Sequence, residues 1–410
     1  MTVKTYQPGE IHGLIEIEAS KCKGCDACNK FCPTDAIEGA SGAAHTINKD
    51  KCLSCGQCLV NCPFGAINET HSALDVVIKK LADPNTQVVG IIAPAVRVAV
   101  GEEFGFAKGE LVTNKLYGAM NQAGFKIFDC NFAADLTIME EGSEFIHRLH
   151  GNLKGEADAG ALPQFTSCCP GWVRYLETQY PSLLPNLSTA KSPQQMAGTV
   201  AKTYGANVYD MPPENIFTVS VMPCTSKKFE ASRPEFNDAW AYHKNNGSSA
   251  AEYPDVDAVL TTREMAQLLK LLEIDLAKAN DFEGDSLFSH YTGAGTIFGT
   301  TGGVMEAAVR TAHKVLTGDE MAQLDFEPVR GLEGVKEAEI TLFDKSLGQE
   351  ITAKVAVVHD MGKNVAPILK DVMAGTSPYH FIEVMNCAGG CVNGGGQPID
   401  GSGTSWLGKA

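Results

Sequence analysis

The sequence has little positive charge and no long apolar run. Its 33 Lys and Arg residues are outnumbered by 49 Asp and Glu residues, which leaves a formal net charge of −16. Nucleic acid binds to a basic face, so this charge argues against a nucleic-acid partner. The longest apolar runs are shorter than the ~18–20 residues that span a membrane, and residues 1–8 contain no apolar core of a secretion signal. From the chain alone we therefore expect no membrane insertion and a cytoplasmic location.

The overall composition is that of a folded protein with more than one domain. The chain has 410 residues, of which 44% are apolar and 20% are charged, and this length predicts two or three domains. Its 14 cysteines would suggest disulfides in a short secreted chain, but a chain of this size builds a core without them. Metal ligation is therefore the better interpretation of the cysteines.

Eight of the cysteines form two runs near the N-terminus. Residues 22–33 and 52–63 both place four cysteines at intervals of x2, x2 and x3, followed by proline. This is the spacing of a bacterial two-cluster ferredoxin, in which the fourth cysteine of each run binds the other cluster. One [4Fe–4S] cluster is therefore assigned to Cys22, Cys25, Cys28 and Cys62, and the other to Cys52, Cys55, Cys58 and Cys32.

A pair of zinc sites is the alternative interpretation of these two runs. Zinc seldom takes four cysteines from eleven residues, so we expect iron–sulfur clusters instead. Two clusters this close together form an electron relay and have no substrate pocket of their own. We therefore expect residues 1–70 to be an α+β ferredoxin-like domain, with a short helix and strand in each half, that serves a site elsewhere in the chain.

The chain after this domain alternates between strand and helix patterns. Residues 87–93 form an apolar run that predicts a buried strand, and ligands tend to sit where such a strand ends, here at Pro94 and Ala95. The patterns predict helices at 72–83, 111–124, 137–149, 262–272 and 304–317, and strands at 125–128 and 256–261. We therefore expect a connecting segment over 71–86 and, over 87–410, a mostly parallel α/β fold flanked by helices.

Three further segments have composition signals of their own. Residues 242–251 are polar and small, which indicates a surface loop, and residues 338–358 alternate as in a β-hairpin. Residues 293–303 are rich in glycine and could form a phosphate cradle. They lack the P-loop lysine and the Rossmann spacing, so nucleotide binding there is the weaker interpretation.

Five more cysteines lie in three short segments of this α/β region. Cys168 and Cys169 are adjacent, Cys224 stands alone, and Cys387 and Cys391 lie four residues apart among five glycines. Thiolates select iron–sulfur clusters, zinc or copper(I), and glycine lets the backbone approach what they hold. Two adjacent cysteines cannot readily bind one corner of a metal site. We therefore expect one of the adjacent pair to be a ligand and the other to be free for acid–base chemistry.

Charged residues near these segments have two interpretations. Lys227 and Lys228 follow a predicted ligand, so one could bind an anion there, while surface exposure is the alternative for either of them. Glu141, Glu144 and Arg148 share one face of the helix predicted at 137–149. On spacing alone, that face indicates a solvated surface.

The three cysteine segments, in this order after a two-cluster ferredoxin domain, closely resemble those of the [FeFe]-hydrogenases over nearly the whole chain. The resemblance implies two α/β lobes with the active H-cluster between them, and the reversible reduction of protons to H2. That cluster is a [4Fe–4S] cubane joined through a cysteine to a two-iron unit with CO, cyanide and a bridging azadithiolate. The implied cubane ligands are Cys169, Cys224, Cys387 and Cys391, with Cys391 bridging to the two-iron unit.

The same resemblance gives roles to residues around the cluster. It implies that Cys168 is the proton-transfer thiol, and it reverses the surface interpretation of the glutamate helix. The implied proton relay outward consists of Glu141, Ser188, Glu144 and Arg148.

Other residues are implied to contact the two-iron unit. Lys227 would donate to one cyanide, and the backbone near Pro94 and Ala95 would contact the other. The remaining pocket residues implied are Met222, Met385, Gln194 and Phe298. Cys130 is most simply a buried apolar residue, and it receives no role.

The resemblance also implies partners. Electrons would come from a soluble redox protein such as a ferredoxin, flavodoxin or cytochrome, and dedicated maturation enzymes would supply the two-iron unit. Only twelve residues follow Pro398, whereas single-chain members continue with further helices. We therefore expect a separate small subunit or a truncated form, and a small subunit with an export signal would make the location periplasmic.

Two relatives of the hydrogenases are the competing interpretations. Sensory relatives tend to lose the proton-transfer cysteine and to gain a signalling domain, while assembly scaffolds lack the full cysteine set and the glutamate relay. This chain retains Cys168, Cys391 and Glu141, which favours a catalytic protein. A simple ferredoxin is excluded, because the ~340 residues outside the cluster domain far exceed a linker.

Overall fold

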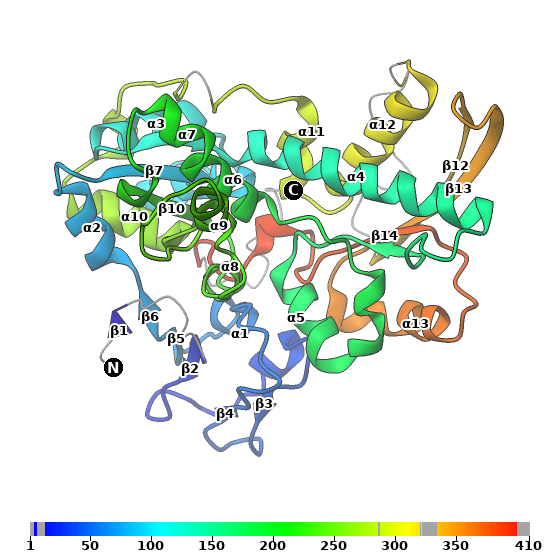
Figure 1. Cartoon of the computed structure of the whole chain (residues 1–410). Coiled ribbons are helices and arrows are strands. Elements are labelled where there is room, and N and C mark those ends of the chain that lie inside the picture. Colours follow the sequence, from blue (N-terminus) through cyan, green and yellow to red (C-terminus); the bar gives the residue numbers. More distant parts are fainter. Residues whose placement is uncertain (1–3, 6–12, 286–287, 320, 322–333, 400–410) are drawn as a thin grey trace.

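A computed structural model gives the fold of the chain (Figure 1) and describes residues 4–5, 13–285, 288–319, 321 and 334–399. The ferredoxin-like segment lies beneath two α/β lobes, and one long helix runs across both lobes (Figure 1). Most of the C-terminal stretch that prompts the expectation of a small subunit, residues 400–410, lies outside the described part. None of the helices in that part is long and apolar enough to cross a membrane.

The ferredoxin-like segment contains two short antiparallel strand pairs. Each of its cysteine runs ends in a short helical turn, so the expected helix and strand are present in each half. Its strands are β2 (Ile15–Ile17) with β5 (Ile67–Glu69), and β3 (Ile37–Glu38) with β4 (Thr46–Ile47). The helical turns are η1 (Cys28–Phe31) and α1 (Gln57–Val60). The strands β1 (Lys4–Thr5) and β6 (His71–Ser72), from the two ends of this segment, form a further, parallel pair.

The first lobe is built on a fully parallel four-stranded sheet. The central strand β7 buries five of its six residues, as expected for a sheet covered on both faces. The strand order is β11 (Ala258–Thr261), β10 (Ile216–Met222), β7 (Gln87–Ile92) and β8 (Lys126–Asp129). Its helices are α2 (Leu74–Leu81), α3 (Thr113–Gln122), α6 (Pro193–Lys202), α7 (Tyr204–Val208), α9 (Asp238–Asn245) and α10 (Thr262–Leu271).

The second lobe is built on a mixed four-stranded sheet. The hairpin expected over 338–358 is present. It pairs in parallel with the strand before Cys387, and that strand pairs in parallel with the strand before Cys168. The strand order is β12 (Val335–Asp344), β13 (Gln349–Val358), β14 (Phe381–Val384) and β9 (Gln164–Phe165). Its helices are α5 (Pro170–Gln179), α12 (Gly303–Thr317) and α13 (Met361–Met373).

The helix α4 (Cys130–Lys154) joins the two lobes, because it packs on α6 in one lobe and on α12 in the other. It is longer than the predicted helix at 137–149. The Asp129 side chain caps it by accepting a hydrogen bond from the Asn131 amide at 2.9 Å, and Gly155 ends it in a left-handed conformation. The glutamates of the predicted relay therefore lie in the middle of a rigid element.

One expectation about a loop needs correction. Residues 242–245 belong to α9, so only 246–251 form the expected loop, because polar side chains suit the exposed side of this helix as well as a loop. The glycine-rich segment forms α11 (Gly293–Thr296) and η7 (Ile297–Gly299) before α12. A Cβ at Gly303 would lie 1.8 Å from the Ile297 carbonyl oxygen. Glycine is needed here for close backbone packing.

The remaining short elements connect these units. They are η2 (Pro94–Val96), η3 (Val100–Phe104), η4 (Pro181–Asn186), η5 (Pro213–Asn215), α8 (Ser226–Ala231), η6 (Leu276–Lys278) and η9 (Cys391–Asn393).

Candidate active site

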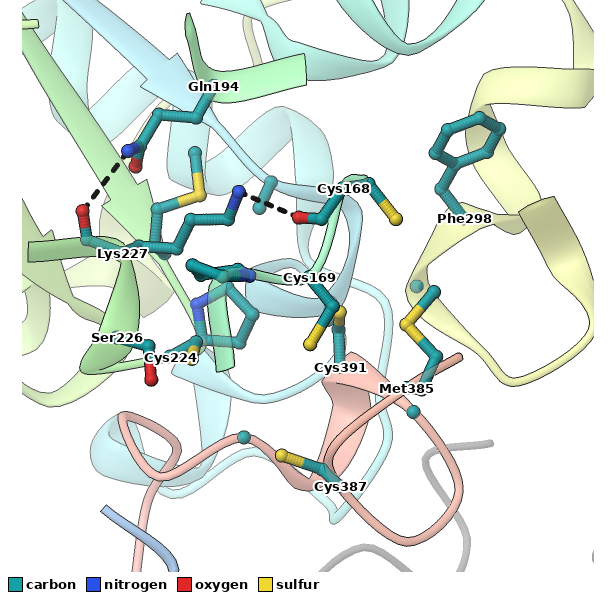
Figure 2. Close-up of a pocket in the computed structure, with 18 of the residues that line it drawn as sticks. Cys168, Cys169, Gln194, Cys224, Ser226, Lys227, Phe298, Met385, Cys387 and Cys391 are labelled. Carbon is teal, nitrogen blue, oxygen red and sulfur yellow. Dashed lines mark hydrogen bonds between the residues drawn. The ribbon is translucent and has the colours of Figure 1, made fainter. Parts of the chain in front are cut away.

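A cavity between the lobes is lined by all five cysteines of the three segments (Figure 2). The space open to the centre of a water molecule is about 80 Å³, several times the ~10–15 Å³ that one water needs. Every predicted pocket residue also lines it: Pro94, Ala95, Gln194, Met222, Lys227, Phe298 and Met385. Cys130 lines it as well, and that residue is buried as expected.

The first lobe contributes the ends of two neighbouring strands. β7 and β10 are parallel and in register, so their carboxyl ends meet at one edge of the sheet. Pro94 and Ala95 lie in η2 directly after β7, while Met222 is the last residue of β10 and Cys224 follows it. This is the edge at which open α/β sheets bind ligands.

The second lobe contributes the other cysteines in the same way. β9 and β14 are adjacent and parallel, with Phe165 paired to Ile382. Cys168 and Cys169 follow β9, and Cys387 follows β14, so these segments also leave neighbouring strand ends. The convergence of the two cysteine segments is thus a consequence of strand order.

The glycines of the last segment allow the cysteine loops to pack closely. Gly390 has φ of 94°, and a Cβ there would lie 2.7 Å from the Thr301 amide nitrogen. A Cβ at Gly394 would lie 2.1 Å from the Pro223 carbonyl oxygen. Only glycine permits these approaches. They bring Cys391 to the same cavity as Cys224.

Lys227 projects into the cavity from the first lobe (Figure 2). Its Nζ donates to the Cys168 carbonyl oxygen at 3.0 Å and to the two Glu230 carboxylate oxygens at 3.1 and 3.0 Å. Burial alone would lower the pKa of Lys227, but the Glu230 carboxylate outweighs it, so the pKa is raised. The ammonium therefore stays charged and oriented toward the cavity.

Lys228 is not a surface residue either, which corrects the surface interpretation for both lysines. It is 1% exposed, and its Nζ donates to Glu69 at 2.7 Å and to Glu264 at 2.9 Å. Glu69 belongs to β5 of the ferredoxin-like segment, whereas Glu264 lies on α10. Lys228 therefore links that segment to the first lobe.

The carboxyl of Glu141 lies next to the adjacent-cysteine segment. Glu141 is fully buried, and its Oε1 accepts from the Ser167 amide at 3.0 Å. Burial raises the pKa of Glu141 to about 7, against the lowering effect of hydrogen bonds from Ser167 and Ser188. A carboxyl with this pKa can both accept and release a proton near neutrality.

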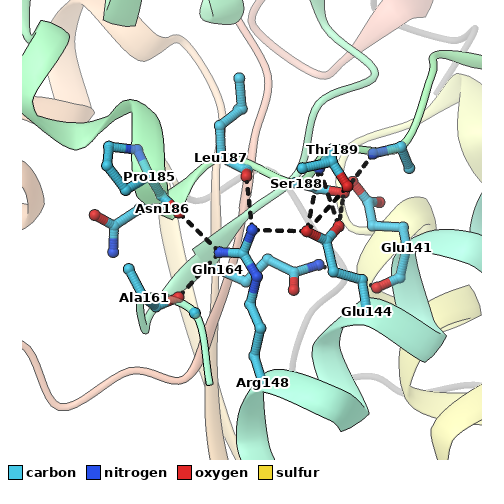
Figure 3. Close-up of polar contacts among 12 residues, drawn as sticks. Glu141, Glu144, Arg148, Ala161, Gln164, Pro185, Asn186, Leu187, Ser188 and Thr189 are labelled. Atoms are coloured by element: carbon cyan, nitrogen blue, oxygen red, sulfur yellow. Dashed lines mark hydrogen bonds and ion pairs between the residues drawn. The ribbon is translucent and has the colours of Figure 1, made fainter. Parts of the chain in front are cut away.

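The other predicted relay residues form a connected network on the outer side of Glu141 (Figure 3). Ser188 Oγ donates to Glu144 at 2.7 Å, and Arg148 Nη2 donates to Glu144 at 2.6 Å. The guanidinium also donates to the carbonyl oxygens of Ala161, Pro185 and Leu187. The Glu144 side chain is 18% exposed and that of Arg148 is 8% exposed, so Glu144 has the greater contact with solvent. The solvated-face interpretation is therefore wrong for Glu141 and Arg148.

The cysteines of the two N-terminal runs lie close to one another across the repeat. Cys22, Cys25, Cys28 and Cys62 line one cavity. Of the other group, burial and then the neighbouring thiols of Cys55, Cys52 and Cys32 raise the pKa of Cys58. Chain segments from both runs thus meet in each group.

The donor set fits thiolate-bound clusters. Backbone amides donate to Cys32 Sγ from Ala36 at 3.2 Å and to Cys62 Sγ from Ala66 at 3.4 Å, at equivalent places in the repeat. Such hydrogen bonds stabilise cluster-bound sulfur. Within the described ranges, no three His, Cys, Asp or Glu residues are grouped to hold a single metal ion. Four thiolates around a cubane bind four different iron atoms, so they need not meet at one point.

The cavity cysteines fit a metal cluster by the same argument. Burial raises the pKa of Cys224 to about 11 and that of Cys391 to about 12. Buried thiolates therefore need a compensating positive charge, which cluster iron supplies.

Two features of the site carried no sequence signal that we used. Glu230 lies three residues after Lys227, and this spacing on a helix could have indicated the ion pair. Gln57 donates a hydrogen bond of 3.1 Å to Cys387 Sγ, although the two residues are 330 positions apart in the sequence. No local sequence pattern predicts such a contact.

The eight thiols of the N-terminal runs and the five thiols that the three later segments bring to one cavity define an iron–sulfur protein, and comparisons with known proteins identify the family. Residues 86–395 match the family described as "Iron only hydrogenase large subunit, C-terminal domain", and residues 21–66 match "4Fe-4S dicluster domain". The chain belongs to the [FeFe]-hydrogenase family, and it is an oxidoreductase whose cofactors are [4Fe–4S] clusters and an H-cluster.

Individual relatives agree with this assignment. The "Periplasmic [Fe] hydrogenase large subunit" of Nitratidesulfovibrio vulgaris is 49% identical over 96% of this chain and 88% of its own length. "Iron hydrogenase 1" of Clostridium pasteurianum is 47% identical over 80% of this chain, and the match spans 53% of that relative. A solved structure of a variant of the [FeFe]-hydrogenase HydA1 from Chlamydomonas reinhardtii has a TM-score of 0.69 at 38% identity, covering 82% of this chain and 87% of that chain.

Proposed function

We propose that the chain interconverts protons and H2 at an H-cluster, with electrons relayed through its two N-terminal [4Fe–4S] clusters. Cys169, Cys224, Cys387 and Cys391 would hold the cubane, and Cys391 would also hold the two-iron unit. When bound, that unit supplies the open iron position at which the H–H bond is made or broken. The observation that carries the proposal is one cavity lined by these four cysteines and by Cys168, whose segment meets the buried carboxyl of Glu141.

Residues of the chain hold and enclose the two-iron unit. Lys227, held in place by Glu230, would donate to one cyanide, and the backbone at Pro94 and Ala95 would contact the other. Met222, Met385, Gln194 and Phe298 complete the wall of the cavity and exclude water. The Gln194 amide donates to Glu230 at 2.9 Å, which adds to the support of Lys227.

The proton route runs along α4. Cys168 exchanges a proton with Glu141, and Ser188 connects Glu141 to Glu144, which is in contact with solvent. The Ser188–Glu144 distance of 2.7 Å and the pKa of Glu141 near 7 support this order. Arg148 cannot give up its proton, because a guanidinium stays charged in proteins. Its part is to orient Glu144.

The electron route enters at the ferredoxin-like domain. Cys25 is exposed. The cluster assigned to Cys25, which we call the outer cluster, is therefore the one that a soluble redox partner can approach. Burial raises the pKa of Cys387, and the nearby thiols of Cys224 and Cys55 raise it further. The cysteine group that contains Cys55, which we call the inner group, therefore lies beside the cavity. The corresponding domain boundaries of the chain are residues 1–70 for the cluster domain, 71–86 for the connecting segment and 87–410 for the H-cluster domain.

Infrared spectroscopy after anaerobic maturation with the two-iron cofactor, with H2 evolution assayed in the same sample, tests the proposal. We expect CO and cyanide bands together with rapid H2 production. Bands with little turnover would indicate a sensory protein instead. Absence of bands, despite intact cubanes and competent maturation, would contradict the H-cluster assignment and favour an assembly scaffold.

Replacement of the buried glutamate tests the proton route. Glu141→Gln cannot exchange a proton, so turnover is expected to fall by ~10²–10⁴-fold, and the dependence of turnover on pH near 7 should disappear. A pH profile of H2 production measures both. Glu140→Gln, on the exposed side of the same helix, is the control and should keep the wild-type profile. Equal profiles for all three proteins would exclude Glu141 from the route.

The raised pKa of the Glu141 carboxyl also predicts that the stability of the folded protein depends on pH. The pKa of Glu141 rises from 4.5 to about 7 on folding. The stabilisation tied to its protonated form is therefore full below pH 4.5 and is lost as the pH rises through 7. The denaturation midpoint of wild type relative to Glu141→Gln should fall over this range, and a constant difference would contradict the raised pKa.

A separate small subunit is also part of the proposal, as are maturation enzymes that supply the two-iron unit. It is supported by the words "large subunit" in the names of the matching family and of one relative. If that subunit carries an export signal, the enzyme is periplasmic. Size measurement of the native enzyme should give a mass above that of this chain, whereas a fully active monomer would refute the two-chain arrangement.

A further inference from the structure

Gln57 connects the ferredoxin-like domain to a cysteine of the active-site cavity. Its Nε2 lies 3.1 Å from Cys387 Sγ and 2.7 Å from the Asn393 carbonyl oxygen. The residue is 6% exposed, so little water competes for these contacts. A carbonyl oxygen can only accept, which means that the amide NH2 of Gln57 faces both atoms. A buried donor therefore points at Cys387, whose sulfur is seen at the lower edge of the cavity in Figure 2.

Tight backbone contacts fix the position of Gln57. Gly56 has φ of 71°, and a Cβ there would lie 2.7 Å from Thr225 Oγ1 and 3.0 Å from the Gly395 carbonyl oxygen. Thr225 Oγ1 also donates to the Ser54 carbonyl oxygen at 2.6 Å. The helix α1 starts at Gln57, so its side chain leaves the backbone directly at this contact.

The internal repeat provides a comparison within the chain. The two cysteine runs are equivalent, and Gln57 corresponds to Ala27 of the first run. Ala27 lines the cavity of Cys22, Cys25 and Cys28 and has no side-chain donor. The donor is thus present only in the run that lies against the active-site cavity.

We propose that Gln57 is a positioning residue for electron transfer, which raises the reduction potential of the cubane through its hydrogen bond to Cys387. The inference rests on the proposed function, because it takes Cys387 as a cubane ligand and Cys55 and Cys58 as ligands of the inner cluster. In the step concerned, one electron leaves the inner cluster, which is oxidised, and enters the cubane, which is reduced. No bond is broken.

The chemistry gives the direction of the effect. An N–H group that donates to a cluster thiolate stabilises the form with more negative charge, which is the reduced form. The hydrogen bond from Gln57 therefore favours the electron on the cubane over the inner cluster. The same side chain connects the two cluster-binding segments directly at a cysteine sulfur.

The test is a redox titration of the full chain with its [4Fe–4S] clusters, monitored by electron paramagnetic resonance. Gln57→Met keeps the length of the side chain and removes the donor, while Gln57→Glu places a negative charge at the sulfur. For Gln57→Met we expect the equilibrium constant of transfer to the cubane to fall about tenfold, which is 59 mV for one electron. The fall should be at least as large for Gln57→Glu.

Thr225→Val is the matched control, because it removes a buried hydrogen bond between the same two segments without touching a sulfur. It should leave the cubane potential at the wild-type value. An unchanged potential in Gln57→Met, or an equal shift in Thr225→Val, would overturn the inference and leave Gln57 as a packing residue. Failure of the cubane assignment on which the inference rests gives a different result, since fully loaded wild-type protein would then show no third [4Fe–4S] signal.

Discussion

Cys168→Ala is expected to lose nearly all turnover and to keep its clusters. The thiol is 9% exposed and lines the cavity, and burial and then the Glu141 carboxyl raise its pKa well above the ordinary value. Its proton is therefore retained until a group in the cavity takes it. Removal of a positioned acid–base group lowers turnover by ~10²–10⁴-fold. H2 assays on the matured protein measure this loss, and infrared spectra check that the CO and cyanide bands persist.

Cys130→Ala is the control for this variant. Cys130 is 3% exposed and lines the same cavity, so both substitutions remove a buried thiol from one wall. Cys130 lies at the start of α4, before the relay glutamates, and we expect near-normal turnover without it. Near-normal turnover in Cys168→Ala, or an equal loss in Cys130→Ala, would disprove the assigned proton route.

Lys228→Met is expected to cause the largest loss of stability. Lys228 Nζ donates to Glu69, to Glu264 and, at 3.0 Å, to the His71 carbonyl oxygen. Its removal leaves two largely buried carboxylates with less compensating charge, which costs about 3–5 kcal/mol. Arg263 still pairs with Glu69 at 2.7 Å, so we expect the lower end of that range. Denaturant unfolding of the cluster-loaded chain measures the change.

Lys270→Met provides the comparison for a surface pair. Lys270 Nζ lies 3.2 Å from Glu103, with side chains 50% and 30% exposed. Such a pair contributes about 0–1 kcal/mol. The two lysine variants should therefore differ clearly in denaturation midpoint. Similar midpoints would show that the buried network around Lys228 does not hold the ferredoxin-like segment to the first lobe.

Local patterns predicted much of this fold correctly. The strand at β7, the hairpin of β12 and β13, and the helix α10 each follow from periodicity within a few residues of their observed bounds. The helix α4 is longer than its periodicity predicts, because the Asp129 side chain caps an earlier start and the helix packs against both α6 and α12. The loop expected at 242–251 was partly wrong because a polar helix face and a polar loop have similar composition.

By itself, the sequence determined the ligand spacing within each cysteine run, the repeat of the two runs and the alternation of strand and helix. These are local properties, since neighbouring residues along one backbone decide them. The tertiary structure decided which distant segments meet. The adjacency of β9 and β14 brings the segments of Cys169 and Cys387 to the same edge of the sheet, Lys228 becomes buried, and Gln57 contacts Cys387. Those contacts depend on strand order and on packing between segments hundreds of residues apart, which no local spacing encodes.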